Sequence, residues 1–154
     1  MVTAETHGAQ QSRRCAASGV ALNSGVSESA ILEFEEKYNV QLPPELRAYF
    51  MRVNGMPQYE IDGLARLWPL EEVSPVSKYF IHQEVSVFVP EADSHFIIGD
   101  YNVEGSYWAT QLTNPASDRP IVVIYDVSNS CEQVTPDFQT FIERYVTEEP
   151  ESLI

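Results

Sequence analysis

The spacing of apolar residues changes twice along this chain, and those changes limit the folds open to it. Apolar residues recur at helical intervals up to about residue 53, follow strand-like patterns from about residue 85, and return to helical intervals after 135. Helices on both sides of a run of strands are typical of an α+β domain. We expect two N-terminal helices, an antiparallel sheet of about four or more strands, and a C-terminal helix on one sheet face.

The first helix is predicted to begin after Ser27, whose side chain suits an N-cap, with Glu28 in the first turn. Its apolar stripe is Ile31, Phe34 and Tyr38, at positions that share one helical face. Acidic residues, Glu33 among them, lie mostly off this stripe. This face should therefore pack on the rest of the domain.

The second helix is predicted within NVQLPPELRAYFMRVNG, residues 39–55. Pro44 suits the first helical position, where the missing N–H has no cost. We expect Asn54-Gly55 to end the helix, because glycine adopts the left-handed cap conformation without penalty. The apolar stripe of this helix is Leu46, Tyr49, Phe50 and Val53.

Strand-like segments rich in β-branched and aromatic residues follow a connector at 56–75 and an ambiguous segment at 76–84. The expected strands are VSVFV (85–89), HFIIGDY (95–101), SYWATQL (106–112) and RPIVVIYD (119–126), with a short one at 132–134. Residues 102–105 and 114–119 should form the turns between them. The last helix is predicted to open at Thr135, with Pro136 at its first position.

Three regions are expected from these patterns. Residues 1–26 are small and polar without apolar periodicity, which indicates a flexible leader. Residues 27–147 form a single domain, and 148–154 form a fraying acidic tail. No run approaches the ~18 consecutive apolar residues of a membrane helix, and we predict a cytoplasmic protein. Cys15 and Cys131 are then expected to be unpaired thiols.

The strongest signal in the composition is charge. Nine Lys and Arg residues against 23 Asp and Glu residues give a net charge of −14. Acids and bases balance within residues 1–30, so residues 31–154 carry all of that charge. A body this acidic repels nucleic acids and anionic membranes, which are excluded as partners. The charge serves either solubility alone or attraction to a basic partner.

Motifs that carry chemistry are missing from the sequence. It has no HExxH, CxxC, GxSxG, GxGxxG or GxxxxGK[ST] pattern. The nearest approaches to a metal or acid–base cluster are His82 with Glu84, and Asp93 with His95 and Asp100. We therefore expect no catalytic site, no metal and no cofactor, with a hydrolase built on the second cluster kept as a remote alternative.

The order of these segments resembles the SUKH superfamily, whose SMI/KNR-type domains include fungal cell-wall regulators and bacterial immunity proteins. The resemblance is based on Leu42-Pro43, Arg47 and Phe50, the closing Asn54-Gly55, and the later blocks HFIIGDYNVEGSYWATQL, PIVVIYD and DFQTFIERYV. It spans about residues 27–147. It implies an α+β domain that binds a protein and does not turn over a substrate.

Two hypotheses follow from the resemblance and the charge. The first is an immunity protein that binds and neutralises a basic toxin domain, such as a nuclease; the second is a regulatory scaffold like the fungal relatives. For partner binding we select acidic residues in and after the connector and one aromatic residue, which has a core position as its alternative. The selected residues are Glu60, Asp62, Trp68, Glu71, Glu72 and Glu104.

Overall fold

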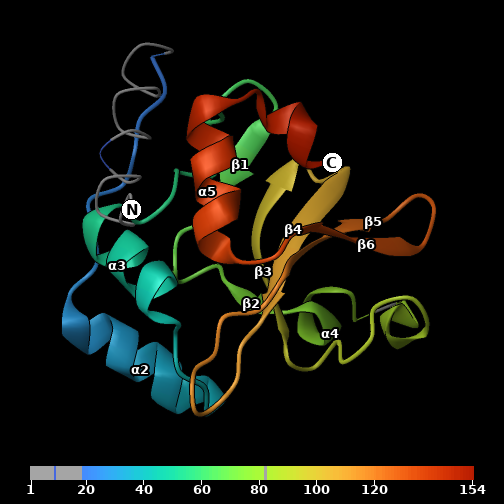
Figure 1. The fold of residues 1–154 in the computed structure, drawn as a ribbon, viewed down its shortest axis with the longest axis horizontal. Helices are drawn as coiled ribbons and strands as arrows, with labels where there is room; N and C mark the ends of the chain where they lie inside the picture. Colours follow the sequence, from blue (N-terminus) through green and yellow to red (C-terminus); the bar gives the residue numbers. More distant parts are fainter. Residues whose placement is uncertain (1–8, 10–18, 82) are drawn as a thin grey trace.

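A computed structural model describes residues 9, 19–81 and 83–154 of the chain. It is an α+β domain in which helices surround an antiparallel sheet (Figure 1). The helices are α2 (Glu28–Tyr38), α3 (Pro44–Arg52), α4 (Val76–Tyr79) and α5 (Phe138–Thr147), with 3-10 helices η1 (Val85–Val87) and η2 (Pro150–Leu153). The strands are β1 (Ala65–Leu67), β2 (Ser74–Pro75), β3 (His95–Tyr101), β4 (Ser106–Gln111), β5 (Ile121–Tyr125) and β6 (Ser130–Thr135).

The predicted N-terminal helix pair is confirmed. The Ser27 side chain accepts a hydrogen bond from the backbone N–H of Ala30 at 3.2 Å, as an N-cap should. Pro44 stands at the start of α3. The apolar stripes of both helices face inward, with Ile31 and Phe34 buried on α2 and Leu46, Tyr49 and Phe50 buried on α3.

Asn54-Gly55 does not end the second helix as expected. Helix α3 stops at Arg52, and Val53 is already extended. Gly55 has a φ of 60°, and a Cβ added there would lie 2.6 Å from the carbonyl oxygens of Leu67 and Trp68. Glycine is therefore required for a close approach of two chain segments, and not for the helix cap.

The sheet has the order β1-β3-β4-β5-β6, with β2 also pairing with β3, and all pairs are antiparallel. The turn predicted at 102–105 joins β3 to β4, and the short strand predicted at 132–134 lies within β6. Two short strands in the connector, β1 and β2, were not predicted. They extend the sheet at its β3 side.

VSVFV at 85–89 was predicted to be a strand, and this prediction was wrong. Residues 85–87 form the 3-10 helix η1 instead. Val85 and Val89 are buried while Val87 is 77% exposed, so the apolar residues contact the core at one-turn spacing. The segment left open at 76–84 begins with the short helix α4.

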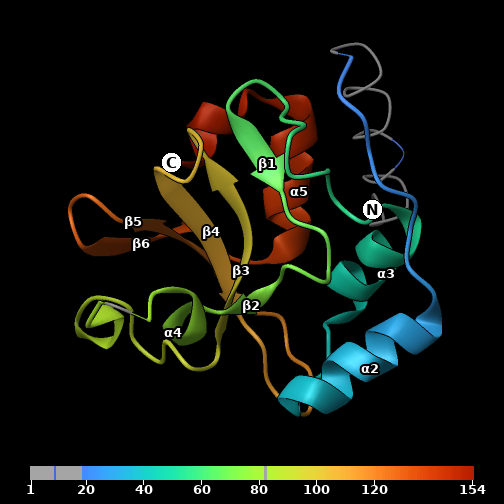
Figure 2. The same ribbon diagram turned by 180° about the vertical axis from the view of Figure 1, so that it is seen from behind.

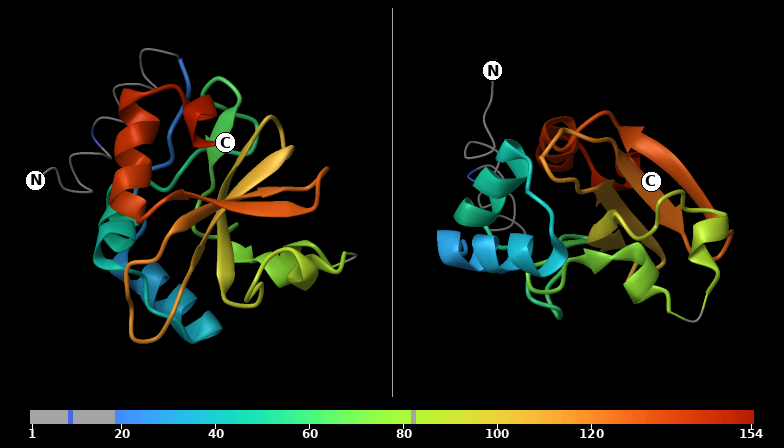
Figure 3. Two further views of the ribbon diagram at one scale, coloured as in Figure 1. Left: turned by 45° about the vertical axis from the view of Figure 1, so that its right-hand side comes forward. Right: turned by 90° about the horizontal axis from the view of Figure 1, so that it is seen from below.

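Two neighbouring residues of β4, Tyr107 and Trp108, pack against elements on opposite sides of the sheet. They do so because successive side chains of a strand point to opposite faces. Trp108 meets α5, with ring centroids 5.3 Å from Phe141 and 6.2 Å from Tyr145. Tyr107 points to the other face, where its ring lies 5.1 Å from Phe80, just after α4. Figures 2 and 3 show α5 and the α4–η1 segment on opposite sides of the sheet.

Both ends of the C-terminal helix differ from the prediction. Asp137, and not Thr135, is the cap, since its side chain accepts from the N–H of Thr140 at 2.7 Å and α5 starts at Phe138. The tail at 148–154 is not frayed. Leu153 is fully buried in η2, and its carbonyl accepts a hydrogen bond from Trp108 Nε1 at 2.8 Å. Pro150 and Leu153 thus anchor the tail to the core, while the other tail residues are exposed.

The leader predicted at 1–26 lies partly outside the described residues. Within its described part, Val26 N–H donates to Phe50 O at 2.9 Å and Asn23 N–H donates to Gly55 O at 3.0 Å. Ser24 also forms a β-bridge with Val53. The folded body therefore begins several residues before Ser27, because the chain there is bonded to α3 and its end.

Two glycines allow a direct test of the close approach at Gly55. Gly55 and Gly63 both have positive φ, but a Cβ at Gly63 would meet nothing within 4 Å. Gly63→Ala should cost about 1–2 kcal/mol of unfolding free energy for backbone strain alone. Gly55→Ala should cost a further ~1–3 kcal/mol for overpacking. Urea denaturation of both variants measures this, and equal losses would contradict the assigned role of Gly55.

Candidate protein-binding surface

The six residues selected from the sequence occupy different environments. Trp68 and Asp62 are buried, with 3% and 4% of their surfaces exposed. Glu60 and Glu72 are half-buried, whereas Glu71 and Glu104 are exposed. The selection therefore does not form one continuous acidic surface, and each residue has to be assessed from its contacts.

Trp68 belongs to the core, which was the alternative to a partner-binding role. Its indole N–H donates to Asp100 Oδ2, and its ring lies 5.3 Å from Tyr79 and 6.3 Å from Tyr107. Asp62 closes a tight turn through two backbone hydrogen bonds with Ala65. Both side chains are buried, so neither is an exposed anchor, and a partner-binding role for these two residues stays a prediction.

Glu72 is engaged within the protein. Its carboxylate receives two hydrogen bonds from the Arg66 guanidinium, at 2.7 Å and 2.9 Å. Arg66 is only 5% exposed, and it also donates to the carbonyl oxygens of Met56 and Pro57. Such bidentate pairs are among the strongest hydrogen-bonded contacts in proteins. The main role of Glu72 is to neutralise a buried cation.

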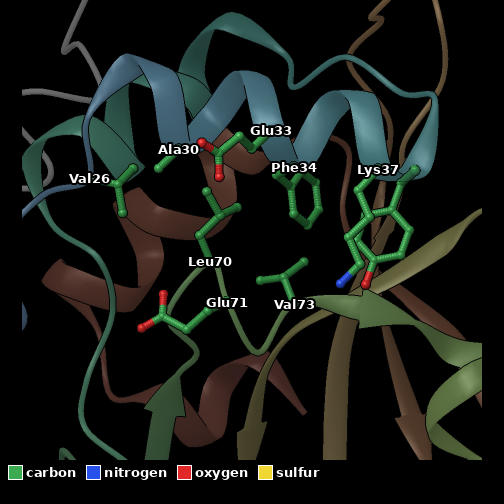
Figure 4. Close-up of a pocket in the computed structure, with 9 residues that line it drawn as sticks. Val26, Ala30, Glu33, Phe34, Lys37, Leu70, Glu71 and Val73 are labelled. Atoms are coloured by element: carbon green, nitrogen blue, oxygen red, sulfur yellow. The ribbon is translucent and has the colours of Figure 1, made fainter.

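Glu71 lines a groove between α2 and the connector, which we call the α2 groove (Figure 4). The groove has a volume of about 280 Å³. Its lining residues are Val26, Ala30, Glu33, Phe34, Lys37, Tyr38, Leu70, Glu71 and Val73. It joins a selected acidic residue to a concave surface.

Asn54 fixes one wall of the α2 groove. Its side-chain oxygen accepts from the backbone N–H of Leu70 at 2.7 Å, and its side-chain nitrogen donates to Glu71 Oε2 at 2.9 Å. Asn54 itself is buried. A single amide therefore positions both an apolar and an acidic residue of the groove.

Charge is distributed unevenly along the α2 groove. Figure 4 shows Glu33 on α2 and Glu71 on the connector toward one end, and Lys37 at the other. Lys37 Nζ lies 4.8 Å from the centre of the Tyr38 ring, a cation–π distance. The acidic end is thus separated from the basic end by the apolar side chains of Phe34 and Val73.

Glu104 lies in the β3–β4 turn and belongs to a different surface. Its carboxylate accepts from the Tyr79 hydroxyl at 3.0 Å, and its backbone N–H donates to Asp100 Oδ1 at 3.1 Å. Burial raises the pKa of Asp100 from its ordinary value, although the hydrogen bond from Trp68 opposes this. Residues 102–104 all have positive φ. Neither Tyr79 nor Asp100 lines the α2 groove.

Glu33 and Asn54 carry no sequence pattern that marks them as binding residues. Glu33 stood out only as an acid off the apolar stripe of its helix, and many exposed acids share that property. Asn54 precedes a glycine after an apolar stripe, a pattern that predicts the end of a helix. Their roles depend on the contact between α2, the end of α3 and the connector, which no local pattern encodes.

The two histidine clusters gain no support as chemical sites. His82 lies outside the described residues. His95 Nδ1 is 3.1 Å from the carbonyl oxygen of Glu91, an ordinary local contact at a strand start. Across residues 19–81 and 83–154, no three His, Cys, Asp or Glu side chains are grouped so that they would hold a metal ion.

The class of protein that the structure defines is an α+β domain, which here carries a small groove with an acidic end and a basic end. The chain belongs to the SMI1 / KNR4 family (SUKH-1), whose family model matches residues 25–144. This confirms the resemblance found in the sequence and supports a protein-interaction or immunity-type domain. No individual curated protein gives a significant match to the chain. Within the described residues, no helix has the length and apolarity to cross a membrane.

Replacement of Glu72 tests its internal role. In Glu72→Gln the amide keeps one acceptor for Arg66 and loses the charge, which leaves a buried guanidinium poorly compensated. We expect a loss of about 1–3 kcal/mol in unfolding free energy by urea denaturation. Glu60→Gln, in the same connector but outside the Arg66 cluster, is the control and should change stability by less than about 0.5 kcal/mol. Similar values for both variants would refute the structural role of Glu72.

Proposed function

We propose that this protein is a non-enzymatic, cytoplasmic immunity protein that binds and neutralises a basic toxin domain, with a nuclease as the favoured kind. The observation that carries the proposal is the family match over residues 25–144. The net charge of −14 supports a basic partner, because opposite charge favours association and like charge suppresses wrong partners.

The acidic surface explains how binding would block a nuclease. A nuclease must hold phosphate groups, so its substrate cleft is basic. An acidic domain is attracted to such a cleft over distances of about a Debye length and then occupies the space that nucleic acid needs. Glu71, Glu104 and Glu60, whose side chains retain exposure, are the selected residues left to contribute to this surface.

Co-expression tests the function. The open reading frame next to this gene should be toxic when expressed alone in a bacterial host, and growth should be restored when this protein is expressed with it. The physical reason is a stable complex that occludes the toxin, so a pull-down should recover both chains. A non-toxic neighbour, or toxicity that persists in the presence of this protein, would refute the immunity function and favour the regulatory-scaffold alternative.

Salt tests the electrostatic part separately. We expect the association rate constant with the toxin domain to fall by about tenfold or more as ionic strength rises from about 0.01 M to about 1 M, since the Debye length shortens from about 30 Å to about 3 Å. Stopped-flow fluorescence measures the rate. The dissociation rate constant should change much less. An association rate independent of salt would remove steering from the proposal and leave binding itself in place.

A further inference from the structure

We infer that the α2 groove receives one arginine or lysine side chain of the partner protein, with its methylene stem on the apolar floor and its cationic head between Glu33 and Glu71. This inference rests on the proposed function, because it specifies how a basic partner is held. It goes further in assigning one contact point and one kind of side chain to a defined place on the surface.

The size of the groove indicates a side chain and not a whole ligand. Its volume of about 280 Å³ lies below the range of about 300–1,000 Å³ that is usual for small-molecule sites. The groove is also open, since α2 and the connector form only its two walls (Figure 4). A side chain projecting from a flat protein surface can enter from above.

The floor of the groove is apolar and its rim is acidic, so the occupant must have both an apolar part and a cationic part. Phe34, Leu70 and Val73 are buried apolar residues along the floor, and they suit methylene groups. Glu33 and Glu71 stand on opposite walls and suit a cation that donates hydrogen bonds. Arginine and lysine combine an aliphatic stem with a charged head, and they commonly bury the stem while the head stays at a polar rim.

Other occupants satisfy only part of this arrangement. A leucine or phenylalanine side chain would cover the floor, but it would desolvate two carboxylates without offering them a donor. An aspartate or glutamate would be repelled by both. Lys37 sets the direction of entry, because it would repel a second cation at its own end of the groove.

Glu71 is held in place before any partner arrives. The hydrogen bond from Asn54 restrains one carboxylate oxygen, and Asn54 is itself buried and bonded to Leu70 N–H. A carboxylate has about four lone-pair sites, so acceptor capacity remains for a guanidinium or ammonium group. A pre-positioned acceptor lowers the entropy lost on binding, which is a general source of affinity.

A small probe tests the groove without the partner. N-acetyl-arginine methylamide should be titrated into the full-length ¹⁵N-labelled protein to about 0.1 M at constant ionic strength, which covers the millimolar affinity of a single side chain. We expect chemical-shift changes at the amides of Ala30, Phe34, Leu70, Glu71 and Val73. The neutral citrulline analogue, of nearly the same shape, should cause much smaller changes.

Matched variants decide whether the two carboxylates bind the probe. Glu33→Gln and Glu71→Gln should each weaken the probe's binding by about tenfold. Glu36→Gln, an exposed position on the same helix outside the groove, should leave it within about twofold. Equal binding of arginine and citrulline probes, absence of shifts at the groove, or equal effects of all three variants would overturn the inference.

The complex separates this inference from the proposed function. If the wild-type protein protects against the neighbouring toxin, Glu33→Gln with Glu71→Gln should raise the dissociation constant by about 10- to 100-fold, and Glu36→Gln should not. An unchanged dissociation constant in the double variant would refute the groove contact while immunity stands. Failure of the wild type to protect would refute immunity, and the probe titration would then decide the groove alone.

Discussion

The hydrogen bonds of the buried Asn54 side chain are the constraint on which this surface depends. Asn54 follows α3, yet its amide bonds to Leu70 N–H and to the Glu71 carboxylate in the connector. Gly55 next to it brings the chain against Leu67 and Trp68. The end of α3, the connector and the sheet edge are joined at this point. The connector wall of the groove depends on this point, because Leu70 and Glu71, which line it, are both bonded to Asn54.

The sequence predicted the elements whose signals are local. Stripes at helical spacing located α2, α3 and α5, and residues 102–105 marked a hairpin turn, because caps, stripes and turns depend on a few adjacent residues. VSVFV and the tail were misjudged for the opposite reason. Val85, Val89 and Leu153 are buried by contacts with distant parts of the chain, and those contacts override local propensity.

The sequence predicted that the candidate site would carry negative charge, but it did not predict where in the fold the site lies. Composition showed a large acidic surplus, and the connector does supply Glu71 to the α2 groove. Sequence could not show that Glu72 is engaged by the buried Arg66, or that Glu33 lies across from Glu71. Identical side chains in one segment take different environments according to which distant residues fold against them.

The distribution of ion pairs explains why a partner of opposite charge would gain from this surface. Among the described residues, Arg47 pairs with Glu28 and Glu35, Arg66 with Glu72, and Arg144 with Glu148. Three of the seven basic residues in the described part of the chain are thus paired within the protein, while most of the acidic residues are exposed to solvent. Their mutual repulsion opposes the compact state, although water and salt weaken it. A basic protein that docks on the surface relieves that repulsion, so the same charge excess that weakly opposes folding favours the complex.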